Sequence, residues 1–141
     1  MAERLRGNKS IKIMKIKNMY WLLGGIVNLL TAFLHLIGGQ QTLIQPLLQS
    51  NLKEQVQTEL LGVWHMVTII LFAISIIFLK NSLGERRAKS ADLIAFVSYL
   101  YIAFSFSFIL SSVFKSIFAP QWILLFPIGV LGIIGLRKSN S

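Results

Sequence analysis

The sequence has no cysteine and few charged residues. Without a thiol, disulfides, thiolate catalysis and cysteine-ligated zinc are excluded. Charged residues make up 13% of the 141 residues, whereas a soluble domain carries about 25%. Hydrophobic residues make up 55%, so the chain has too little polar surface to cover a water-facing globule. We therefore expect most of its apolar surface to face a lipid bilayer.

Acidic residues are the scarcest charged type, five against fourteen basic residues, and the net charge is +9. In a soluble protein this balance would suggest nucleic-acid binding. Here, however, six basic residues precede Tyr20, four lie between Lys80 and Lys89, and two are Arg137 and Lys138. Basic clusters beside apolar runs are typical of topology determinants and lipid-phosphate contacts. We expect the bilayer, and no nucleic acid, as the partner of these charges.

Four apolar stretches cover residues 20–39, 60–79, 93–114 and 118–136. A helix needs about 20 residues to cross the hydrocarbon core. The fourth stretch is the shortest and contains Pro127, which predicts a kinked helix; a hydrophobic hairpin that enters and returns is the alternative there. The sequence predicts an all-α integral membrane protein, in which residues 1–141 form a single domain built as an antiparallel bundle of four transmembrane helices.

The basic clusters also predict the orientation of the bundle. With the N-terminus inside, twelve of the fourteen basic residues lie in the cytoplasm, including those of a basic loop at 80–92. Both termini are then cytoplasmic, and the connection 40–59 lies outside. Within it, leucines and an isoleucine at helical spacing around Pro46 predict a short segment lying on the outer membrane surface, before a helix that starts near Leu52.

The first apolar stretch also invites two other readings. A basic region before an apolar run is typical of a signal peptide, but signal h-regions have about 7 to 15 residues and end at a small-x-small site. This run is longer, and its end is a poor cleavage context. We expect a retained helix. Met14 is an alternative start that would shorten the basic arm without changing the topology.

Small and polar residues follow one face of each predicted span. Such residues usually mark the faces on which membrane helices pack. The first three faces carry hydroxyl, amide or imidazole groups, and the fourth carries glycines. In span order the residues are Gly24, Asn28, Thr31, His35 and Gly38 in the first; Gly62, His65, Thr68 and Ser75 in the second; Ser98, Tyr101, Ser105 and Ser112 in the third; and Gly129, Gly132 and Gly135 in the fourth.

The two histidines are the most informative of these residues. His35 lies near the outer end of the first span, and His65 lies at a similar depth in the second, which enters from the same side. Ionisable residues inside spans usually face the bundle interior and often mark function. We therefore predict an outer-leaflet pocket, with interhelical hydrogen bonding as the structural alternative. Its candidate lining is Asn28, Thr31, His35, Glu59, His65 and Thr68.

Three functions are compatible with this pocket. The first is a non-enzymatic membrane component that binds an apolar ligand, a membrane-protein partner or further copies of itself. It ranks first because the chain has no G-x-S-x-G motif and its spans carry no carboxylate. The second is ligation of haem b by His35 and His65, with Gly38 and Gly62 leaving room for the porphyrin. The third is a metal or proton-handling site made of His35, His65 and Glu59.

The first half of the chain contains His35 with Gly38-Gly39, then Pro46-Leu47-Leu48 and Trp64-His65. This layout resembles that of small four-span bacterial membrane proteins of unassigned activity. The likeness covers about the first half of the chain. It implies a four-span fold in a bacterial inner membrane, and it implies no mechanism.

Overall fold

The computed structural model describes residues 16–84 and 88–138, and nearly all of them are helical. Met14 and the rest of the basic arm before residue 16, part of the predicted basic loop at 85–87, and residues 139–141 lie outside the described residues. No strand occurs within the described ranges. The helical elements in chain order are α1 (Met19–Phe33), the π-helical turns η1 (Leu34–Gly38) and η2 (Gln40–Ile44), α2 (Gln45–Leu48), α3 (Glu54–Leu83), α4 (Ala88–Lys115) and α5 (Gln121–Lys138).

In the part of the chain described, four helices are long and apolar enough to cross a membrane: Met19–Leu48, Glu54–Leu83, Ser90–Lys115 and Gln121–Lys138. The prediction of an all-helical chain is confirmed for the described residues, and so is the prediction of four segments long and apolar enough to cross a membrane. Pro127 lies inside α5, yet the helix continues to Lys138. The fourth segment is therefore one helix rather than a hairpin that turns back.

The first helix continues past its predicted end at residue 39. It runs through η1, η2 and α2 to Leu48, and Gly39 keeps helical dihedral angles (φ −69°, ψ −28°). Two π-helical turns accommodate this stretch within a continuous helix. The predicted surface segment is therefore not separate from the first helix, because its apolar residues continue that helix. Only residues 49–53 remain non-helical before α3.

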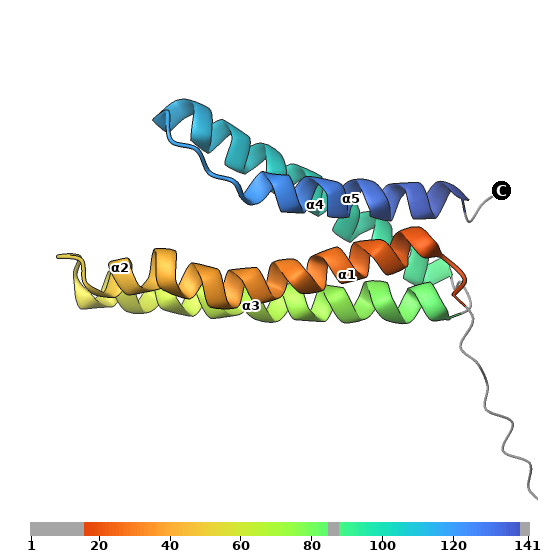
Figure 1. Cartoon of the computed structure of the whole chain (residues 1–141), viewed down its shortest axis with the longest axis horizontal. Helices are drawn as coiled ribbons and strands as arrows, with labels where there is room; N and C mark the ends of the chain where they lie inside the picture. Colours follow the sequence, from red (N-terminus) through yellow and green to blue (C-terminus); the bar gives the residue numbers. More distant parts are fainter. Residues whose placement is uncertain (1–15, 85–87, 139–141) are drawn as a thin grey trace, which may run out of the picture.

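Helix α1 is the central element of the packing (Figure 1). It packs on both α3 and α5, α5 also packs on α4, and α3 and α4 meet only sparingly. The backbone N–H of Lys17 donates to the Ser82 carbonyl oxygen, and the Asn28 side chain reaches Leu71. Contacts between α1 and α3 therefore run in opposite order along the two helices. In Figure 1 the end of α4 and the start of α5 lie well away from α2.

The glycines of α5 allow close approach of its neighbours, as predicted. A Cβ at Gly129 would come within 2.7 Å of the Ser98 carbonyl oxygen on α4, and one at Gly135 would overlap the Trp21 ring on α1. Gly132 faces both the Ser98 hydroxyl and the Phe78 ring. A side chain at any of the three positions would push α5 away from α1 or α4.

Candidate functional site

A buried polar cluster joins three helices, α1, α3 and α4. Asn28 on α1 is fully buried, and its amide donates to the Leu71 carbonyl oxygen (2.9 Å) and to the Ser75 hydroxyl (3.0 Å) on α3. The Tyr101 hydroxyl on α4 donates to the Asn28 amide oxygen at 2.6 Å. The cluster of Asn28, Ser75 and Tyr101 therefore ties α4 to the α1–α3 pair.

Every side-chain group of this cluster has a partner. An asparagine amide has two donors and a carbonyl oxygen, and here both donors and the oxygen are engaged. The Ser75 hydroxyl donates onward to the Leu71 carbonyl oxygen at 2.9 Å. Polar groups in a membrane need such internal partners because lipid offers none. The cluster therefore holds α1, α3 and α4 together through hydrogen bonds whose donors and acceptors are all used.

The two threonines predicted for the pocket bond within their own helices. The Thr31 hydroxyl donates to the Val27 carbonyl oxygen at 2.8 Å, and the Thr68 hydroxyl donates to the Trp64 carbonyl oxygen at 3.0 Å. Both residues are buried. Their hydroxyl hydrogens are therefore directed at backbone of the same helix rather than at a shared cavity.

Nearer the α2 end, His35 pairs with Trp64. The two rings are stacked, with centroids 3.6 Å apart and planes inclined by 17°. The His35 Nε2 lies 3.4 Å from the Trp64 carbonyl oxygen. Gly39, one helical turn further on, leaves the space that the Trp64 ring fills, because a Cβ there would overlap it. The indole N–H of Trp64 is buried and has no hydrogen-bond partner in the described residues.

His65 and Glu59 are both exposed, whereas His35 packs on Trp64. His65 is exposed on α3, and Glu59 is exposed and accepts a hydrogen bond from Gln55 at 3.0 Å. Successive residues of a helix point about 100° apart, so burying Trp64 against α1 turns His65 towards the outer surface. The expected facing pair of imidazoles, which haem ligation from both sides requires, is not formed. Among the residues described, no three His, Asp or Glu side chains are grouped as metal ligands would be.

The six predicted residues thus fall into separate places. Asn28 belongs to the central cluster, His35 belongs to the stack, Thr31 and Thr68 bond within their helices, and the other two are exposed. Sequence reasoning placed Ser75 and Tyr101 only on packing faces and noted Trp64 only as a neighbour of His65. The hydrogen bond between Asn28 and Tyr101 joins residues 73 positions apart, so no local sequence pattern predicts it.

No protein-family profile, curated protein or solved structure matches the chain. The geometry described above is therefore the basis of the functional argument.

Proposed function

We propose that the chain is a non-enzymatic component of a bacterial inner membrane that binds a protein partner. In this proposal the four long apolar helices form an antiparallel bundle. The opposite order of contacts along α1 and α3 supports that arrangement. Both termini lie in the cytoplasm, because that orientation places twelve of the fourteen basic residues there. Reporter fusions at the two ends test the orientation, and opposite compartments would contradict it.

The use of the polar side chains supports a structural role for the bundle. Asn28, Ser75 and Tyr101 bond to one another across helices, and the buried threonines bond to their own helices. Small and polar residues are common at such helix interfaces. These side chains hold the helices together and leave the outer surfaces to make external contacts.

The observation that carries partner binding is an exposed apolar tip between α4 and α5. We define the α4–α5 tip as Val113, Phe114, Ile117 and Phe118, whose side chains are 69%, 80%, 68% and 69% exposed. Val113 and Phe114 lie in the last turn of the candidate span Ser90–Lys115, whereas Ile117 and Phe118 follow the end of α4 at Lys115, where a span normally gives way to polar residues. Exposed apolar patches mark contacts with a protein or with a membrane, and residues beyond the end of a span favour the protein. We infer that a partner protein covers this tip.

Site-specific photocrosslinking in the native membrane tests this proposal. A photoreactive residue at Phe118 is expected to give one discrete protein adduct. The matched control is Ile76, which is 64% exposed on the membrane-spanning helix α3 and is expected to give lipid adducts alone. An adduct with twice the mass of the chain would identify a second copy as the partner. Lipid adducts alone at both Phe118 and Phe114 would refute partner binding at the tip.

A further inference from the structure

His65 lies in a candidate membrane span but faces away from the rest of the chain. It is exposed, and it lies about 8 Å along the helix from Leu60, where the apolar stretch of α3 begins. Among the described residues, none forms a hydrogen bond with its imidazole ring. Ionisable side chains inside spans almost always face a bundle interior or pair with another polar group. The described part of the chain supplies no such group for His65.

Contacts along its whole length fix the rotation of α3 about its axis. The Trp64 ring stacks on His35, and the Ser75 hydroxyl accepts from the Asn28 amide at 3.0 Å. These contacts hold one face of α3 against α1. The buried residues of α3 recur along this face at spacings of three and four: Trp64, Thr68, Leu71, Ser75, Phe78 and Ser82.

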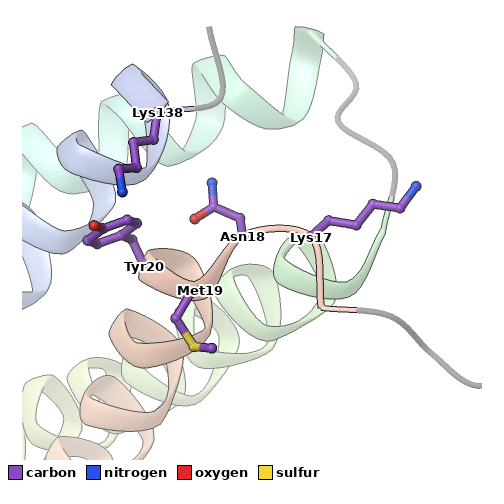
Figure 2. A pocket seen from close by; sticks show the side chains of 5 residues that line it. All are labelled: Lys17, Asn18, Met19, Tyr20 and Lys138. Carbon is purple, nitrogen blue, oxygen red and sulfur yellow. The ribbon is translucent and has the colours of Figure 1, made fainter. Parts of the chain in front are cut away.

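The end of the bundle where α1 begins is fixed as well (Figure 2). The Lys17 backbone N–H donates to the Ser82 carbonyl oxygen of α3 at 2.9 Å, and the Asn18 amide donates to the Gly135 carbonyl oxygen of α5 at 2.9 Å. Figure 2 shows the Asn18 side chain directed from the start of α1 towards the helix that carries Lys138. Turning α3 about its axis would break contacts at both of its ends, so His65 stays on the outside.

His65 belongs to an exposed face of α3. We define the α3 contact face as Thr58, Gly62, His65 and Ile69, which recur at spacings of four, three and four and are all exposed. A Cβ at Gly62 would have open space around it, so this glycine is not used for packing within the chain. In Figure 1 α3 lies at the edge of the bundle, with α1 between it and α5. The face is therefore open to a neighbouring helix.

We propose that the α3 contact face binds the same face of a second copy of the chain, so that the two His65 rings form a hydrogen bond with each other. The basic clusters give all copies the same orientation in the membrane. A two-fold axis along the membrane normal then brings identical residues to the same depth. A neutral imidazole has one N–H donor and one acceptor nitrogen, so two such rings are complementary. The inference rests on the proposed membrane placement and does not involve the partner at the α4–α5 tip.

Gly62 and Lys80 indicate how the two helices cross. Gly62 lies about one turn from His65 and lets the two backbones approach closely. Lys80 is exposed and follows Gly62 by about five full turns, on the same side of α3. Helices in contact along their whole length would therefore bring two ammonium groups together. A crossing of about 40° at Gly62 avoids this and moves the axes about 14 Å further apart at Ile76, which stays in lipid.

Thiol crosslinking in the native membrane tests the α3 contact face. The chain has no cysteine, so a single introduced cysteine gives an adduct of twice the chain's mass only with a second copy. Ile69→Cys places the thiol on the face. Ile70→Cys is the matched control, because Ile70 is 49% exposed and points about 100° away from Ile69. With a short bifunctional thiol reagent, Ile69→Cys is expected to give the doubled mass, and Ile70→Cys about fivefold less of it.

Association in lipid vesicles tests the pair of imidazole rings. Energy transfer is measured between full chains fused to donor and acceptor fluorescent proteins, in vesicles of phosphatidylethanolamine and phosphatidylglycerol. His65→Leu removes the hydrogen bond and is expected to raise the dissociation constant about three- to eighteenfold, the equivalent of about 0.6 to 1.7 kcal/mol. His65→Gln keeps a donor and an acceptor and is expected to stay within about twofold of the unmodified chain. Circular dichroism checks that each variant is folded.

Three results would overturn the proposal. Equal yields of the doubled mass at Ile69 and Ile70 would show that the copies meet only by random collision. An adduct of a different mass at Ile69 would identify another protein on this face. An unchanged dissociation constant in His65→Leu would show that the two rings do not meet. The crosslink expected at Phe118 does not involve α3, so the two proposals fail separately.

Discussion

Replacing Tyr101 by phenylalanine removes one buried hydroxyl between α4 and α1 and changes little else in shape. The hydroxyl donates to the Asn28 amide oxygen at 2.6 Å, and the two residues are 2% and 0% exposed. Interhelical hydrogen bonds in membranes contribute about 0.6 kcal/mol on average and at most about 1.7. The bond is short and fully buried, so we expect a loss of about 1 to 1.7 kcal/mol in the free energy of unfolding.

The measurement is reversible unfolding in mixed micelles of increasing dodecyl sulfate content, followed by circular dichroism. The matched control is Tyr99→Phe, the same change on the same helix at a residue that is 62% exposed. We expect it to stay within about 0.5 kcal/mol of the unmodified chain. Equal stabilities for the two variants would refute the view that the cluster clamps α4 to the α1–α3 pair.

A double-mutant cycle assigns the loss to the hydrogen bond itself. Asn28→Ala removes three interhelical bonds, which at the average value amount to about 2 kcal/mol, and it also leaves a cavity. In that background the Tyr101 hydroxyl has lost its acceptor, so Tyr101→Phe should cost nothing further. An undiminished cost would mean that the hydroxyl acts through another group.

Two further comparisons concern the contact between His35 and Trp64. Gly39→Ala should lower the free energy of unfolding by about 1 to 3 kcal/mol, because the added methyl group overpacks against the Trp64 ring. Gly38 has open space around it, so Gly38→Ala should be neutral or stabilising by up to about 1 kcal/mol in the same unfolding assay. The reverse order of stabilities would contradict the packing. His35→Ala should lose about 0.5 to 1.5 kcal/mol with the ring stack, whereas His65→Ala, at an exposed position, should change stability by less than about 0.5 kcal/mol. Equal losses for the two histidines would mean that both face the bundle interior.

The amino-acid sequence by itself determined the helical, membrane-spanning character of the chain. Long apolar runs with few charges have one stable form in lipid, because a helix satisfies its backbone polar groups internally. The sequence also indicated the close-packing glycines Gly129, Gly132 and Gly135, and the inward position of Asn28, since helical spacing places these residues on packing faces. These features depend on local composition and helical periodicity.

Tertiary structure alone decided which polar groups meet. Tyr101 reaches Asn28 because the packing of α4 brings the Tyr101 hydroxyl to the level of Asn28 on α1, and no local pattern encodes this approach. Either Trp64 or His65 could have faced α1, because adjacent residues differ by about 100° around a helix. The large Trp64 ring fills the space beside Gly39, and this packing leaves His65 on the outside. The rotation of each helix about its axis is set by such packing, which involves residues far apart in the sequence.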